Sequence, residues 1–308
     1  MSLHVIAGAG GTGSPTALLL ADAGERVRLI SRRGGGPEHP LIERIAADAT
    51  DADRLTELTR GAATLINTAM PPYDRWPAEF PALAAALLTT AERTGAGYVM
   101  MGNTYGYGRV DGHFTEDLPM APVAVKGQVR AQMWLDALAS HEAGRARVTE
   151  VRASAFLGAG AGSLYNWLVP APVLAGQPAA FPGDLDAPKT WSYLGDVART
   201  LTTVARDDRS WGRAWHVPST ATISVRDLTG RLAELAGVPT PRLTSMSVED
   251  LTEAGRRNPI IAEVVEMMYS LVNPDLLDSA VTEQMFGLVA TPLDDVLRET
   301  VQAFPPTP

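Results

Sequence analysis

The chain has 308 residues, of which 45% are hydrophobic and 20% are charged, so it can bury a sizeable core. Its net charge of −9 argues against a nucleic-acid-binding surface, because such a surface needs clustered cations. The absence of cysteine excludes disulfides and thiolate metal sites, and it favours a reducing compartment.

Short apolar runs alternate with helical patterns through the first half of the chain. This alternation predicts an α/β fold, in which a doubly wound parallel sheet carries helices on both faces, as in a Rossmann fold. The expected strands are 3–7, 27–30, 42–47, 64–67, 98–101 and 148–152, and the expected helices are 12–23, 51–60, 79–93 and 123–141.

The pattern changes after Arg152. Residues 158–162 and 170–188 predict loops and short elements, and a helix over 192–205 and a strand over 214–217 follow. Amphipathic helical patterns dominate from Ser224 to about Ala303. We therefore expect a nucleotide-binding Rossmann domain of residues 1–158, completed by about 189–217. A smaller, mainly helical substrate-binding domain is expected from residues 159–188 and 218–308.

A glycine-rich motif follows the first expected strand and opens the first expected helix. Gly8, Gly10 and Gly13 match G-x-G-x-x-G, with Gly11 and Thr12 between them. The first glycine permits the tight turn, the second lets backbone approach a pyrophosphate, and the third lets helix and strand pack closely. The helix N-terminus then offers free N–H groups to the anion. The motif predicts a dinucleotide site.

The residues after the second strand predict which dinucleotide binds. Proteins that bind NAD usually place a carboxylate there for the ribose 2′-hydroxyl, but this chain has Ser31, Arg32 and Arg33. A guanidinium matches a 2′-phosphate, so we expect NADP(H), although a solvated basic loop is the alternative. Asp48 and Ala49, after the third strand, are expected beside the adenine; a turn or capping role for Asp48 is the alternative.

Further residues carry a resemblance to a known family. They are the glycine loop, Asp48, the pair Tyr105-Gly106, and the segments 192–198 (SYLGDVA) and 215–217 (WHV). With these features the chain resembles the extended or atypical short-chain dehydrogenases/reductases of the NAD-dependent epimerase/dehydratase type, over most of its length. The resemblance implies that Thr68, Ala69 and Met70 lie along the cofactor ribose and that Ser154 faces the nicotinamide. It also implies a homodimer.

The residues that carry catalysis in that family are replaced in this chain. The family uses a Ser or Thr after the fifth strand and a Tyr-x-x-x-Lys pair on the next helix, whereas this chain has Met101, Lys126 and Arg130 at these positions. In one interpretation Lys126 donates the proton, because desolvation lowers the pKa of a lysine. In the other, Lys126 and Arg130 only hold the cofactor.

Other side chains are expected near the substrate. Asn103 and Tyr105 follow the fifth strand, and ligands of open α/β sheets bind at the carboxyl ends of strands. Tyr105 is therefore a second candidate proton donor, with a packing role as the alternative. Tyr165, Trp167 and Trp191 are expected to form an apolar roof over the substrate, unless they belong to the core.

These features together predict an NADP(H)-dependent oxidoreductase that reduces a carbonyl or an activated alkene of a small organic molecule. One alternative is an epimerase, isomerase or cyclase without net redox, and another is a non-enzymatic NADP-sensing regulator. The histidines are few and scattered, so we expect no metal site. We expect neither nucleic-acid nor membrane partners, and a cytoplasmic location, since no signal peptide or long apolar run is visible.

Overall fold

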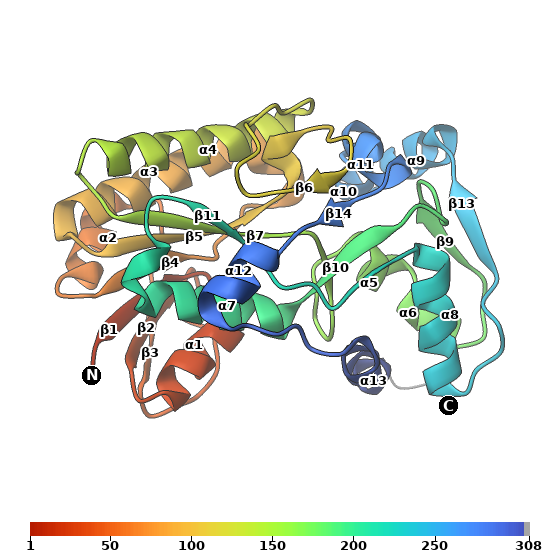
Figure 1. Cartoon of the computed structure of the whole chain (residues 1–308), viewed down its shortest axis with the longest axis horizontal. Coiled ribbons are helices and arrows are strands. Elements are labelled where there is room, and N and C mark those ends of the chain that lie inside the picture. The colour runs from red at the N-terminus through yellow and green to blue at the C-terminus, as the bar shows by residue number, and fades with distance from the viewer. Residues whose placement is uncertain (305–308) are drawn as a thin grey trace.

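A seven-stranded parallel sheet forms the centre of the computed structural model, which describes residues 1–304. Its strand order is β11-β7-β5-β4-β1-β2-β3, so the chain winds outward in both directions from β1 (Figure 1). This order confirms the predicted doubly wound Rossmann arrangement. The strands are β1 (Leu3–Ala7), β2 (Arg26–Ser31), β3 (Ile42–Ala46), β4 (Thr64–Asn67), β5 (Gly97–Asn103), β7 (Val148–Ala153) and β11 (Ala214–His216).

Helices cover both faces of this sheet, and its central strands β1 and β4 are buried along their whole length. One face packs against α2, α3 and α4, and the other against α1, α7 and α12 (Figure 1). The helices are α1 (Gly13–Asp22), α2 (Ala52–Thr59), α3 (Trp76–Thr94), α4 (Val125–Glu142), α7 (Leu194–Arg206) and α12 (Ala280–Phe286).

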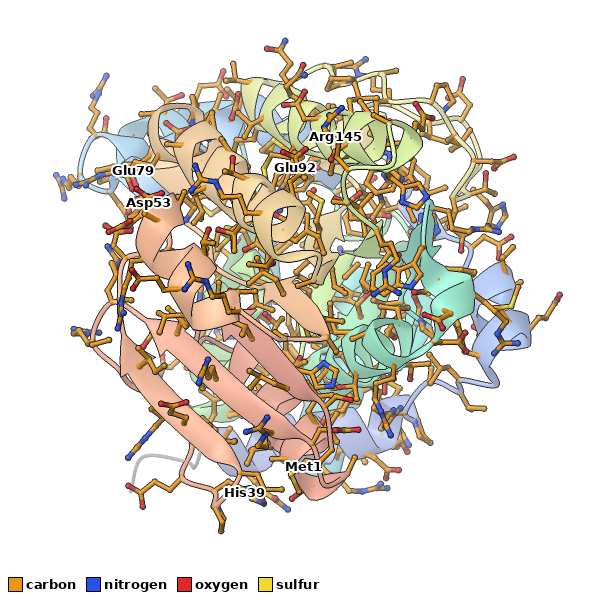
Figure 2. The ribbon with its side chains drawn as sticks, turned by 90° about the vertical axis from the view of Figure 1, so that its left-hand side faces the viewer. Met1, His39, Asp53, Glu79, Glu92 and Arg145 are labelled. Carbon is orange, nitrogen blue, oxygen red and sulfur yellow. The ribbon has the colours of Figure 1, made fainter. Side chains whose placement is uncertain are left out.

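Helix α3 begins at Trp76, three residues before the predicted start. Proline in the first turn lacks only an N–H group that would have no helical partner, so Pro77 does not prevent this earlier start. Polar contacts join the far ends of α3 and α4. Glu92 accepts hydrogen bonds from the Ser140 hydroxyl at 2.6 Å and from Arg145 Nε at 2.8 Å (Figure 2).

A second apolar core lies beyond the carboxyl ends of the strands (Figure 1). Two small sheets contribute to it, in the orders β12-β10-β8 and β13-β9, while β14 pairs with β6. The strands are β6 (His113–Phe114), β8 (Ala155–Leu157), β9 (Ala179–Pro182), β10 (Lys189–Tyr193), β12 (Ala221–Ile223), β13 (Leu243–Met246) and β14 (Leu276–Leu277). The α-helices are α5 (Leu164–Leu168), α6 (Pro170–Leu174), α8 (Val225–Ala236), α9 (Val248–Gly255), α10 (Pro259–Ala262), α11 (Met268–Val272) and α13 (Leu293–Ala303). Short 3-10 turns are η1 (Tyr73–Arg75), η2 (Tyr105–Tyr107), η3 (Asp208–Ser210) and η4 (Val265–Met267).

The segment around Ser192 corrects one expectation. Ser192 and Tyr193 belong to strand β10, and the helix predicted from residue 192 begins at Leu194. The strand forms because β10 pairs with β8 on one side and with β12 on the other. The division into two domains stays a prediction. No helix within residues 1–304 is long and apolar enough to cross a membrane.

A buried polar network lies at the carboxyl end of β7 and β11. Arg152 Nε donates to Glu150 at 2.6 Å, and Arg152 Nη1 donates to the Tyr107 hydroxyl at 2.6 Å. The Tyr107 hydroxyl also lies 2.7 Å from His216 Nε2. Burial lowers the pKa of His216 to about 4, so the imidazole is neutral at physiological pH.

Candidate active site

A cavity of about 1450 Å³ runs along the carboxyl ends of the sheet strands and reaches the second core. This is the edge at which open α/β sheets bind their ligands. The cavity brings together almost all of the site residues expected from the sequence, and only Gly13 and Lys126 are not in its wall. The expected residues that line it are Gly8, Gly10, Gly11, Thr12, Ser31, Arg32, Arg33, Asp48, Ala49, Thr68, Ala69, Met70, Asn103, Tyr105, Ser154, Tyr165, Trp167 and Trp191.

The glycine loop joins β1 to α1 at one end of the cavity. Gly8 has a φ of +107°, and a Cβ there would lie 2.6 Å from the backbone nitrogen of Ala69. A Cβ on Gly13 would overlap the Gly8 carbonyl, while the space beside Gly10 is open. The Thr68 hydroxyl donates to the Gly8 carbonyl at 2.9 Å. The loop is thus closely packed except where a ligand would approach.

The two arginines after β2 stand exposed in the cavity wall. Within residues 1–304, neither Arg32 nor Arg33 has a carboxylate within ion-pairing distance. Asp48, which follows the neighbouring strand β3, accepts from the Thr50 backbone N–H at 2.9 Å and from its hydroxyl at 2.8 Å. These hydrogen bonds lower the pKa of Asp48. The guanidinium groups of both arginines are therefore available to bind an anion. Asp48 makes the hydrogen bonds of a turn residue, which is the alternative role considered for it.

Two tyrosines and an arginine line the cavity beyond β5. Asn103 Oδ1 accepts from the Tyr105 backbone N–H at 3.1 Å, which fixes the start of η2. The Tyr105 hydroxyl lies 3.5 Å from that of Tyr73, and burial raises the pKa of both phenols. Arg130 Nη1 donates to the Met101 carbonyl at 2.9 Å. Tyr105 is therefore a protonated phenol at neutral pH.

Lys126 lies outside the cavity wall and is fully buried. Its Nζ forms ion pairs with Glu263 and with Glu266, the latter at 2.5 Å, and sits 4.6 Å from the centre of the Tyr73 ring. Lys126 thus joins the start of α4 to the segment 259–273. Its expected role toward cofactor or substrate stays a prediction.

A serine, an aspartate and a lysine lie close together in the cavity wall beyond the end of β7. The Ser154 hydroxyl donates to Asp275 Oδ2 at 2.7 Å, while Asp275 Oδ1 has no hydrogen-bond partner within residues 1–304. Lys189, in an isolated bridge with Asp275, donates through Nζ to the Ser270 and Asn273 carbonyls at 3.0 Å each. Burial raises the pKa of Asp275 and lowers that of Lys189.

The aromatic roof is partly core. Tyr165 is buried, and its hydroxyl accepts a hydrogen bond from the Thr229 hydroxyl at 3.4 Å. The Tyr165 ring packs edge to face against Trp191, with 5.1 Å between the ring centres. The Trp191 indole donates to the Ile223 carbonyl at 3.0 Å, whereas Trp167 is 54% exposed. Tyr165 and Trp191 therefore have both of the roles considered for them, because they pack in the core and also line the cavity.

Sequence reasoning missed several cavity residues. Tyr73, Lys189 and Asp275 belong to no motif, and only long-range packing brings them to the wall. The one available signal was that Lys126 and Lys189 are the only lysines in the chain. Among the described residues, no cluster of three or more potential ligands could hold a metal ion.

Comparisons with known proteins relate the chain to one family and one fold. The model of the NAD dependent epimerase/dehydratase family matches residues 4–217. No curated protein sequence matches significantly. The similar solved structures include the following three. The dTDP-glucose 4,6-dehydratase of Bacillus anthracis in complex with NAD is 15% identical to this chain with a TM-score of 0.79, and the alignment covers 99% of this chain and 96% of the dehydratase.

The UDP-glucuronic acid 4-epimerase of Bacillus cereus, with UDP-glucuronic acid and NAD, has 15% identity and a TM-score of 0.79 and covers 98% of each chain. DesIV of Streptomyces venezuelae, a dTDP-glucose 4,6-dehydratase with NAD, has 21% identity and a TM-score of 0.78, covering 98% of this chain and 96% of its own. At these identities the likeness shows the fold alone.

Proposed function

The chain belongs to the NAD dependent epimerase/dehydratase family, as its motifs indicated, and we propose that it is an NADP(H)-dependent oxidoreductase. Its reaction would be the reduction of a carbonyl or an activated alkene of a small organic molecule. One observation carries this proposal: a cavity joins a glycine loop with two free arginines to a protonated phenol.

The residues at the glycine end fit a phosphorylated dinucleotide. The open space beside Gly10 and the free N–H groups at the start of α1 suit a pyrophosphate. Arg32 and Arg33 supply unpaired guanidinium groups where a carboxylate would repel a 2′-phosphate. The similar solved structures were determined with NAD, so the preference for NADP(H) rests on these arginines.

The residues at the Tyr105 end of the cavity fit the reduction of a bound substrate. The bound cofactor would supply hydride, and the protein must then supply a proton and polarise the acceptor oxygen. Tyr105 is protonated because burial raises its pKa, and it lines the cavity, so its hydroxyl is our proposed donor. Lys126 is the weaker candidate, because Glu263 and Glu266 enclose its ammonium group outside the cavity wall.

The same phenol disfavours the alternative without net redox. An epimerase that begins by oxidising its substrate needs a base near the cofactor, and a phenol with a raised pKa is a poor base. The aromatic side chains that line the cavity beyond the glycine loop likewise favour an enzyme over a regulator that only senses NADP.

Nucleotide binding tests the first half of the proposal. Purified protein should bind NADPH at least tenfold more tightly than NADH, because a charged hydrogen bond contributes about 1.5–3 kcal/mol. Arg32→Ala and Arg33→Ala should each reduce this preference. Arg60→Ala, which removes an exposed arginine outside the cavity, should not. Equal affinities for both nucleotides in the wild type would contradict the proposal.

Turnover tests the second half. We expect NADPH oxidation with members of a panel of ketones and enones, and a large loss of kcat in Tyr105→Phe with an unchanged dissociation constant for NADPH. Substrate turnover without net NADPH consumption would instead support the epimerase, isomerase or cyclase alternative.

A further inference from the structure

The cavity wall contributed by residues after Ala153 differs in character from the wall around the glycine loop. It consists mainly of apolar and aromatic side chains. Among the described residues in this part of the wall, only Lys189 and Asp275 carry a charge. Its apolar side chains include Phe181, Trp191, Ile260, Val264, Met267 and Leu271.

The lysine in this wall is not free to bind an anion. Lys189 is 3% exposed, and its Nζ already donates to two backbone carbonyls of the segment 259–273. A nucleoside diphosphate needs arginines or free lysines around its phosphates. This wall provides none, because the Nζ of its one lysine is already held by backbone carbonyls. A diphosphate-bearing substrate therefore fits poorly, although the similar solved structures include one with UDP-glucuronic acid bound.

Asp275 is only half satisfied. The Ser154 hydroxyl donates to Oδ2, whereas Oδ1 is buried and has no hydrogen-bond partner in the described part of the chain. A buried polar oxygen without a hydrogen-bond partner destabilises the structure, so a donor from a bound ligand would be favourable. Lys189 is the other charged side chain in this part of the wall, so this end of the cavity carries one positive and one negative charge and has no net charge to attract a cation.

We propose that this end of the cavity binds an uncharged, mainly apolar molecule and that Asp275 accepts a hydrogen bond from one of its hydroxyl groups. Asp275 is thus the specificity-determining residue for a hydroxylated substrate. This inference rests on the proposed function in one respect, namely that the dinucleotide occupies the glycine end of the same cavity.

Ligand binding to the wild-type protein saturated with NADP⁺ tests the substrate class. The probes are 1-tetralone, its hydroxylated positional isomers, UDP-glucose and UDP-glucuronic acid, titrated by calorimetry. At least one hydroxytetralone should bind about tenfold or more tightly than 1-tetralone, because a hydrogen bond to a charged group contributes that much. Tighter binding of either nucleotide sugar, or no gain from any hydroxyl position, would overturn the inference.

Variants of Asp275 test the residue itself. Asp275→Asn should lose most of the preference for the hydroxylated probe, and Asp111→Asn, which removes an exposed aspartate outside the cavity, should keep it. If circular dichroism shows that Asp275→Asn is unfolded, Asp275→Glu serves instead. It retains the charge but displaces the carboxylate from Ser154, so it should also lose preference. An undiminished preference in a folded variant contradicts the inference.

Nucleotide titrations separate this inference from the proposed function. The affinity for NADP⁺ is measured for each Asp275 variant, because Asp275 holds the Ser154 hydroxyl, which is expected to face the nicotinamide, and the probes are compared only at saturating NADP⁺. If the wild type binds no NADP⁺, the proposed function fails. The probe titrations are then run with NAD⁺ or with the unliganded protein, and their outcome judges the hydroxyl-binding role on its own.

Discussion

Replacing Lys126 with methionine should loosen the helical segment 259–273 that forms part of the cavity wall. The segment contributes Ile260 and Met267, among others, to that wall. Lys126 reaches it from α4 through ion pairs with Glu263 and Glu266. Methionine fills a similar volume without the charge, so the variant removes the ion pairs and little packing.

The structure sets the size of this effect. Removing one partner of a fully buried ion pair costs about 3–5 kcal/mol. The side chains of Glu263 and Glu266 keep 32% and 27% exposure, so water can solvate both carboxylates after the lysine is gone. We therefore expect a loss of about 2 kcal/mol in the free energy of unfolding, between the values for exposed and buried pairs.

Urea unfolding and hydrogen exchange measure the two consequences. Amide protection should fall within residues 259–273 and stay unchanged in β1 and β4. A double-mutant cycle with Glu266→Gln should give a coupling of about 1 kcal/mol or more. The matched control is Arg145→Met, because the exposed pair of Arg145 with Glu92 should contribute at most about 1 kcal/mol. Unchanged stability and protection in Lys126→Met, together with lost reductase activity, would refute the anchoring role and favour the proton-donor interpretation.

Three further predictions concern buried groups. Gly13→Ala should abolish NADPH binding or prevent folding, because its Cβ would overlap the Gly8 carbonyl; calorimetry and circular dichroism distinguish the two outcomes. Arg152→Met should lower the free energy of unfolding by about 3–5 kcal/mol, because it leaves the Glu150 carboxylate buried and unpaired; urea unfolding measures this. His216→Gln should remove part of the acid sensitivity of stability, measured by urea unfolding between pH 7 and pH 4.

The direction of the His216 effect follows from its pKa. The value is about 4 in the folded protein and about 6.5 in the unfolded chain, so the unfolded chain binds a proton between these pH values and the folded protein does not. Stability from this group is therefore complete above pH 6.5 and decreases toward pH 4, by roughly 3 kcal/mol. The same pH dependence in His216→Gln would contradict this, as would wild-type NADPH affinity in Gly13→Ala or wild-type stability in Arg152→Met.

The nucleotide half of the molecule was predictable because its signals are local. Most strands of the sheet contain a short apolar run, and the glycine loop begins at Gly8, directly after the first strand. Periodicity and spacing are enough to place such features. The wall residues Arg32, Arg33 and Tyr105 follow their strands directly, so their positions in the cavity could be inferred from the strand ends.

The other half depends on contacts between distant residues. Strand β10 forms because β8 and β12 pair with it. The sequence around Ser192 does not show this pairing, and together with the residues that follow it predicts a helix. Asp275 meets Ser154 across 121 positions, and Lys126 meets Glu263 across 137. No pattern within a single segment predicts contacts between residues so far apart in the sequence. The partners of Lys126 therefore could not be predicted, and neither could the role of Asp275 in the cavity wall.

The scarcity of lysine gives this protein an unusual chemical property. Its only two lysines are Lys126 and Lys189, both are buried, and both hold the segment 259–273. Amine-selective reagents should therefore modify neither side chain while that segment is closed. Labelling of these two amines, followed by mass spectrometry, would report the opening of the segment without any engineered probe. The rate at each lysine would show which end of the segment detaches first when a ligand enters.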